Sequence, residues 1–168
     1  MVGSRDLIIA EIPRLRRYAR ALTGSMDAAD DLVQETLERA LEKWLFWKRE
    51  RDLRPWLFSI MHNLHIDHLR KAKHIDYFPQ DELPEVLYRP DQLDGLEIRD
   101  LDRALAQLPI DQRQVLLLIT LEGLSYKEVA KTLRIPVGSV MSRLSRARTR
   151  LRALLEEDAA PLLRVVKS

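Results

Sequence analysis

The sequence predicts an all-α protein in which a flexible linker joins two small helical domains. Apolar residues recur at steps of three and four in successive segments, which is the spacing of amphipathic helices. No stretch alternates between apolar and polar residues as a half-buried strand would. An acidic, proline-containing segment without a sustained period separates the first three expected helices from the rest.

The first two expected helices lie between residues 8 and 44. In the first, the apolar pattern runs from Ile8 to Leu22 and stops at Gly24, and Pro13 inside it suggests that the regular helix starts near there. The second is expected to begin at about Asp27, with Ser25 as its N-cap. Its apolar face comprises Ala29, Leu32, Val33, Thr36, Leu37, Ala40, Leu41 and Trp44.

A third helix is expected to start at Pro55, because proline suits the first turn of a helix, and to run to about Leu69. Its inward face comprises Leu57, Ile60, Met61 and Leu64. The three apolar faces would close one small core, so a first domain is expected over residues 1–74. Residues 75–95 are expected to be the linker. Extended, the roughly 25 residues that follow Arg70 reach about 80 Å, so the two domains could contact separate parts of one partner.

The second domain is expected over residues 96–168. A helix over 96–108 and a very apolar helix after Asp111 precede a helix-turn-helix. Ser125 and Glu128 have the spacing of a capping box at the start of its first helix. This helix breaks before Pro136 and a second one begins there. The inward face of the second helix comprises Val140, Leu144, Ala147, Leu151 and Leu154.

Positive charge is concentrated on the helix-turn-helix. The net charge of the chain is only +2, but residues 125–155 contain eight Lys or Arg and one acid, Glu128. Such a run can be a solvated helix face or a surface that binds phosphates. Because few acids interleave with the arginines, their mutual repulsion favours an anionic partner, and DNA contact is the better interpretation.

Composition excludes several other classes. The chain has no cysteine, which rules out disulfides, thiolate metal sites and cysteine nucleophiles and is typical of the cytosol. No signal-peptide core and no run of about 18 apolar residues is present, so we expect a cytoplasmic protein without membrane insertion. No glycine-rich phosphate loop or catalytic set is recognisable, so we expect no enzyme and no cofactor.

Two groups of side chains suggest alternatives. His62, His65 and His68 recur every three residues, but the third is rotated away from the first two and no supporting pattern accompanies them, so we expect no metal. Packing, solvent exposure or contact with an open DNA strand explains them better. Interhelical packing also explains the following aromatic residues better than a base-stacking platform does: Trp44, Phe46, Trp47, Trp56 and Phe58.

Two blocks of the sequence resemble a known family. The segments DAADDLVQET (27–36) and PWLF (55–58), with Asn63, Asp67 and Arg70, are similar to domain two of bacterial extracytoplasmic-function (ECF) sigma factors. The segments EGLSYKEVA (122–130), IPVGSVMSRL (135–144) and RAR (146–148) resemble domain four of the same family. The resemblance implies a dissociable, non-catalytic subunit that directs core RNA polymerase to promoter DNA. It also implies control by an anti-sigma factor.

The resemblance also implies roles for individual residues. Those expected to dock on core polymerase are Asp31, Leu32, Gln34 and Glu35. Those expected to meet the minus-ten element are Asn63, Arg70, Lys71, Lys73 and His74, although Asn63 is as well explained by a structural role. Those expected to read base edges at the minus-thirty-five element are Ser139, Met141, Ser142, Ser145 and Arg146, with Arg143 and Arg150 on phosphates.

Three positions depart from the family pattern. Met141 stands where a basic residue is common, Ser145 where a bulkier residue often stands, and Arg134 where glycine is frequent before the turn. Two other functions remain alternatives: a stand-alone dimeric helix-turn-helix regulator, and a metal-dependent enzyme that uses the histidines. A linker between unlike domains argues against the first, because half-site spacing needs a fixed dimer interface.

Overall fold

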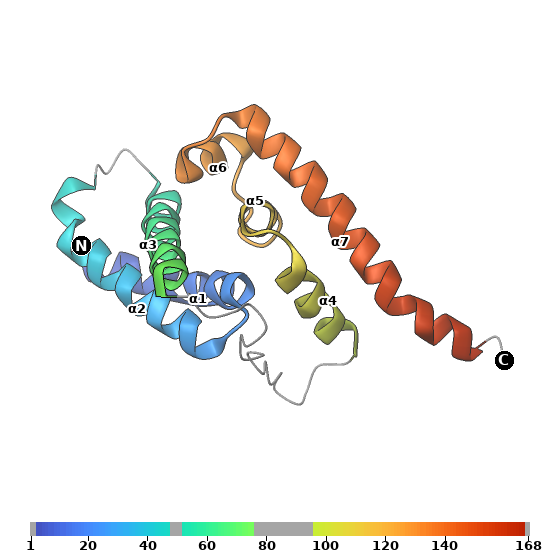
Figure 1. Ribbon diagram of the computed structural model, residues 1–168. Helices are drawn as coiled ribbons and strands as arrows, with labels where there is room; N and C mark the ends of the chain where they lie inside the picture. Colours follow the sequence, from blue (N-terminus) through green and yellow to red (C-terminus); the bar gives the residue numbers. More distant parts are fainter. Residues whose placement is uncertain (1–2, 48–51, 76–95, 167–168) are drawn as a thin grey trace. The chain divides into compact units, whose positions relative to one another are not determined.

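The computed structural model describes residues 3–47, 52–75 and 96–166, which are helical and contain no strand (Figure 1). The all-α prediction is confirmed. Their elements are α1 (Ser4–Thr23), α2 (Met26–Glu42), the 3-10 helix η1 (Trp44–Phe46), α3 (Leu53–Ile75), α4 (Leu96–Gln107), α5 (Ile110–Thr120), α6 (Tyr126–Leu133) and α7 (Val137–Val166). They form two compact units: α1, α2, η1 and α3 in the first, and α4, α5, most of α6 and α7 in the second. From residue 76 onward, the expected linker lies outside the described residues.

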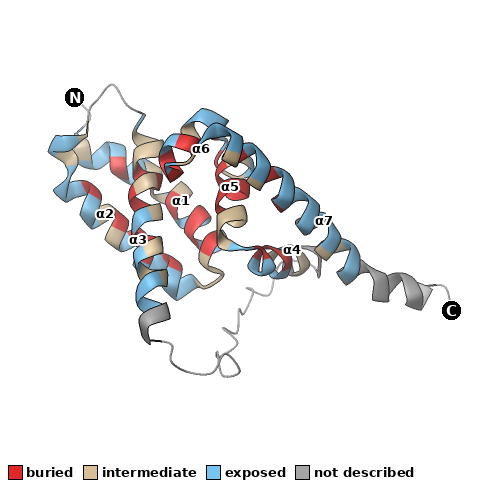
Figure 2. Cartoon of the chain, turned by 45° about the horizontal axis from the view of Figure 1, so that its top comes forward, coloured by how far each residue is buried: buried red, intermediate tan, exposed pale blue. Residues whose placement is uncertain are grey.

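In the first unit, α2 packs against both α1 and α3, and the buried faces of the three helices form one core (Figure 2). The Tyr18 ring meets the Phe58 ring edge-on, with centroids 4.9 Å apart, which ties α1 to α3. Other fully buried side chains in this core are Leu15, Leu22, Leu32, Leu57 and Met61. The core predicted from the three apolar faces is therefore confirmed, except for Leu41 of α2, whose side chain is 48% exposed.

Helix α1 begins at Ser4, so the prediction that it starts near Pro13 is wrong. Proline inside a helix costs about 3 kcal/mol, and contacts made by the turns before it offset this cost. Ile8 in these turns is buried, and Glu11 accepts hydrogen bonds from Arg54 of α3 at 2.9 and 3.3 Å. Neither contact is visible in the local sequence.

The predicted caps around α2 are present. Gly24 ends α1 in the left-handed conformation, with φ of 70°, and its N–H donates to the Arg20 carbonyl. The Ser25 hydroxyl then accepts a hydrogen bond from the Ala28 N–H at 3.3 Å. These two residues turn the chain between α1 and α2 and satisfy backbone groups at both helix ends.

Helix α3 runs past the predicted end at Leu69 to Ile75. Its last turns contain Arg70, Lys71, Lys73 and His74, and cationic side chains stabilise the carboxyl end of a helix through the macrodipole. Arg70 and Lys71 therefore lie on a regular helix, as do the backbones of Lys73 and His74. The side chains of Lys73 and His74 lie outside the described residues.

In the second unit, α4 and α5 both pack on α7. The predicted inward face of α7 is confirmed, because Val140, Leu144 and Ala147 are buried and Leu151 and Leu154 are half-buried. Partner residues in the core of this unit include Ala104, Leu108, Val115, Leu118 and Val129. None of the helices in the described ranges is long and apolar enough to span a membrane.

The helix-turn-helix consists of α6, a short turn and α7. The predicted capping box is present: the Glu128 N–H donates to Ser125 Oγ at 3.1 Å, and the Ser125 N–H donates to Glu128 Oε1 at 3.0 Å. After the turn, the Pro136 carbonyl accepts from the N–H groups of Ser139 and Val140 and starts α7. Local sequence therefore fixes both helix starts.

Arg134 lies in the turn with φ of 55°, the left-handed region that favours glycine. The next N–H, that of Ile135, donates to the Ala130 carbonyl at 3.0 Å and closes the end of α6. This is the Schellman geometry in which glycine is usual. The arginine thus occupies a glycine-type cap at the cost of backbone strain.

We expect Arg134→Gly to raise the free energy of unfolding by about 0.5 to 1 kcal/mol. Relief of the left-handed penalty exceeds the entropy that glycine adds to the unfolded chain. Urea unfolding followed by circular dichroism measures the change. Arg134→Ala is the matched control, because it removes the charge and keeps the strain. If both variants gained equally, backbone strain would not be the cause.

Candidate nucleic-acid interface

The outward face of α7 is polar and exposed along its first turns. Each residue advances a helix by about 100°, so Ser142, Ser145 and Arg146 lie opposite the buried Val140 and Ala147. These three of the five predicted reading residues are exposed. Met141 is also exposed but lies on one flank, and Ser139 is partly buried on the other. The Ser142 hydroxyl donates to the Ser139 carbonyl at 3.2 Å and keeps its oxygen free to accept from a base or phosphate.

Arg143 makes a contact that the sequence did not indicate. Its Nε lies 3.8 Å from Asp111 Oδ2 in the first turn of α5, and both side chains are partly exposed. Ion pairs of this kind contribute about 1 kcal/mol or less, so the contact does not prevent Arg143 from turning to a phosphate. Arg150, the other residue predicted to contact phosphate, is exposed.

The candidate minus-ten residues occupy the outer side of α3. Asn63, Arg70 and Lys71 are exposed, whereas Met61 and Leu64 pack inward. Asn63 and Arg70 are seven residues apart, which places them within about 20° of one another on the helix. An amide that can donate and accept therefore shares a face with a guanidinium, the two kinds of group that an unpaired nucleotide engages.

Helix α2 presents an acidic stripe on the side opposite its buried residues. The members of this stripe are all exposed: Asp27, Asp31, Gln34, Glu38 and Glu42. Within it the Gln34 amide donates to Glu38 Oε1 at 3.3 Å. Carboxylates in this arrangement offer acceptors to the Arg and Lys side chains of a protein partner.

Two of the residues predicted to dock on polymerase do not lie on the acidic stripe. Leu32 is 0% exposed in the core, and Glu35 Oε2 lies 2.8 Å from His68 Nε2 on α3. Leu32 therefore lies in the core, behind the exposed stripe. The Glu35–His68 pair likewise joins α2 to α3, which gives His68 a structural role.

The histidines and aromatic residues mostly serve packing. Among the residues that the structure describes, no group of three or more His, Cys, Asp or Glu could hold a metal ion. Trp44 packs on Trp47 and Trp56, with centroids 4.9 and 6.4 Å away, and Phe58 is buried. The packing interpretation is wrong for Phe46, whose side chain is 80% exposed at the end of the single-turn helix η1.

Together, these features define a helical protein of two compact units, with a helix-turn-helix whose second helix is basic and, on the other unit, an acidic stripe. Two family models match it: the sigma2 domain of PhyR over residues 8–62 and sigma-70 region 4 over residues 98–151. The chain belongs to the ECF RNA polymerase sigma factors. Members of this family are DNA-binding transcription initiation factors.

Three similar proteins support this family assignment. The chain is 39% identical to the ECF RNA polymerase sigma factor EcfG of Rhodopseudomonas palustris over 157 residues, which cover 93% of this chain and 87% of that protein. The structure of the sigma factor RpoE in complex with the anti-sigma factor NepR from Bartonella quintana matches with a TM-score of 0.79 and 33% identity, covering 90% and 96% of the chains. CnrH in complex with the cytosolic domain of CnrY matches with a TM-score of 0.69 and 27% identity, covering 93% and 91%.

Proposed function

We propose that this chain binds core RNA polymerase, directs it to a subset of promoters and initiates transcription there without catalysing a reaction itself. The observation that carries the proposal is the combination, in one ECF sigma factor, of an exposed basic reading helix and an acidic stripe on a separate unit. Because promoters and polymerase occupy the cytoplasm, the protein acts there. In-vitro run-off transcription with purified core enzyme on a genomic library tests the proposal, and initiation at no site would refute it.

The proposed division of labour follows the two units. Residues 1–74 bind core polymerase and the minus-ten element, residues 75–95 link the units, and residues 96–168 bind the minus-thirty-five element. At the minus-ten element, Arg70 and Lys71 lie along the opened strand with Lys73 and His74 beyond them on α3. Asn63, on the same face as Arg70, contacts a base edge. Support comes from the exposure of Asn63, Arg70 and Lys71.

For polymerase docking, we propose the acidic stripe of α2 as the contact surface. Asp31 and Gln34 belong to it directly, and Leu32 and Glu35 position the helix from behind through the core and the His68 contact. Carboxylates on an exposed helix face fit a basic protein surface, since charge complementarity sets the orientation and rate of association.

We expect Asp31→Arg to weaken binding to core polymerase about tenfold, or about 1.4 kcal/mol, because a repulsive charge replaces an attractive one within the stripe. Fluorescence titration of the labelled protein with core enzyme measures it. Glu157→Arg reverses an exposed charge on α7 and serves as the matched control. Equal affinity of Asp31→Arg and wild type would exclude the stripe as the docking surface.

An anti-sigma factor is the third partner that we propose. The related RpoE and CnrH structures each contain a second protein, the anti-sigma factor NepR and the cytosolic domain of CnrY respectively. The basic and acidic surfaces of the present chain are both open to such a partner. Affinity purification from the native cell should recover a partner that blocks run-off transcription, and recovery of none would count against this control.

A further inference from the structure

Arginines occupy two opposite flanks of α7, and the proposed phosphate contacts of Arg143 and Arg150 use only one flank. Arg148 and Arg150 are two residues apart, which places them about 200° apart around the helix axis. Arg152 lies one turn beyond Arg148, on the same flank as Met141. Arg143 and Arg150 therefore occupy one side of the reading face, and Arg148 and Arg152 occupy the other.

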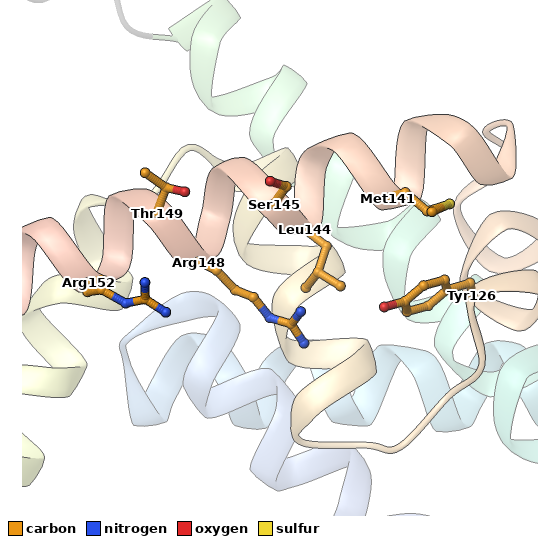
Figure 3. Close-up of a pocket in the computed structure, with 7 residues that line it drawn as sticks. All are labelled: Tyr126, Met141, Leu144, Ser145, Arg148, Thr149 and Arg152. Carbon is orange, nitrogen blue, oxygen red and sulfur yellow. The ribbon is translucent and has the colours of Figure 1, made fainter.

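An open groove follows the flank of Arg148 and Arg152 (Figure 3). It has a volume of about 230 Å³, and Tyr126, from the first turn of α6, forms the wall facing α7. Leu144 forms the apolar floor, and Met141 lies at the end of the groove near the turn. In Figure 3 the Tyr126 hydroxyl points to the Arg148 side of the groove.

The groove is cationic. Its lining contains two arginines and no acid, and both arginines are exposed. In the part of the chain that the structure describes, neither Arg148 nor Arg152 belongs to an ion pair, unlike Arg143 with its Asp111 contact. Two like charges one turn apart repel each other, and an anion between them removes that repulsion.

We propose that this groove, lined by Tyr126, Arg148 and Arg152, binds the phosphodiester backbone of the DNA strand opposite the one that Arg150 contacts. The inference rests on the proposed function. A major groove is about 12 Å wide and has a sugar-phosphate backbone along each wall, so a helix that lies in it presents one flank to each strand. Guanidinium and hydroxyl donors suit phosphate oxygens.

Contact on both flanks has a mechanical consequence for α7. Phosphate contacts on one side alone leave the helix free to roll within the groove, whereas contacts on both sides fix the direction in which Ser142, Ser145 and Arg146 point. Arg148 and Arg152 thereby position the reading residues and carry no base preference of their own.

The test compares salt dependence of DNA binding by the full-length chain. The probe is a 30-base-pair duplex of mixed sequence, and affinity is measured at several KCl concentrations. Each lost phosphate contact lowers the slope of log K against log[salt] by about 0.9. We expect the double variant Arg148→Ala/Arg152→Ala to lower the slope by the amount that corresponds to about two lost contacts. We expect Tyr126→Phe to weaken binding without changing the slope.

The matched control is Arg16→Ala/Arg20→Ala, which removes two exposed arginines at the same spacing from α1. If the control lowered the slope equally, the effect would come from the overall charge of the protein, and the proposal would be overturned. If the slope were unchanged for the Arg148/Arg152 variant and lowered for Arg150→Ala, the groove would not bind the DNA backbone, although the protein would still bind DNA. The proposal would also be overturned if the Arg148/Arg152 variant lost binding only to an acidic protein partner and kept its binding to DNA. No duplex binding by wild type, together with no run-off transcription, would instead refute the proposed function.

Discussion

Replacement of Arg113 by alanine is expected to lower the free energy of unfolding of the second unit by about 3 kcal/mol. The Arg113 Nη2 group donates to the carbonyls of Ala106 and Leu108, each at 2.8 Å. These carbonyls lie where α4 ends and the chain turns into α5. A hydrogen bond to a charged donor contributes about 1.5 kcal/mol or more, and alanine would leave both carbonyls without this donor. Burial lowers the pKa of Arg113, which reflects the partly desolvated position of the guanidinium.

The position of the tryptophans makes this effect separable. All three tryptophans, at 44, 47 and 56, belong to the first unit. Far-UV circular dichroism follows both units during urea unfolding, whereas tryptophan fluorescence follows the first. Arg113→Ala should therefore shift a circular dichroism transition to lower urea and leave the fluorescence transition unchanged. Arg103→Ala removes an exposed arginine from α4 and is the control. Equal midpoints for Arg113→Ala and the control would contradict the capping role.

Local signals in the sequence were sufficient for helix identity and for most helix starts. Ser25 and Ser125 cap helices because hydroxyls next to apolar periodicity satisfy the first N–H groups, and the structure contains both bonds. Gly24 ends α1 for an equally local reason, since glycine adopts the left-handed cap freely. Short-range backbone hydrogen bonding of this kind can be read from a few adjacent residues.

The sequence was insufficient where contacts between residues far apart in the chain determine the structure. Helix α1 continues through Pro13 because its early turns contact α3, through a Glu11–Arg54 pair whose members are 43 residues apart. The Glu35–His68 contact joins positions 33 residues apart. No periodicity within one helix specifies which residue of another helix will face it. Such pairs require the packed arrangement of the helices.

Leu32 shows how a motif match and helical periodicity differ at the candidate site. Its position on the apolar face of α2 was evident from the sequence, and the structure buries it completely. The family resemblance nevertheless assigned it to docking, because a motif match treats neighbouring residues as one unit. Helical periodicity separates them: Asp31 and Leu32 differ by about 100° and face different environments. Periodicity should therefore decide which members of a matched motif can touch a partner.

The reading face of α7 leads to a prediction about promoter specificity. Arg146 is exposed on this face, where a guanidinium can bond a guanine in two places. Arg150 lies toward the flank, where a phosphate is the nearer partner. Arg146→Ala is expected to weaken recognition at one promoter position by about 1 to 3 kcal/mol, whereas Arg150→Ala should weaken binding to all sequences and lower the salt slope by about 1.

A set of promoters with single base-pair changes in the minus-thirty-five element separates these effects. Binding is measured with the protein in complex with core polymerase, which holds both units in their working arrangement. The Arg146→Ala variant should bind the promoter altered at the contacted position as well as it binds the unaltered promoter, because it no longer discriminates between bases at that position. For Arg150→Ala, the ranking of promoters should match wild type. Arg146→Lys, which keeps the charge but not the paired donors, should also lose discrimination. If both alanine variants lost affinity equally for every promoter, then Arg146 would contact only the backbone, and the orientation of α7 in the groove would have to be rotated toward its Arg148 flank.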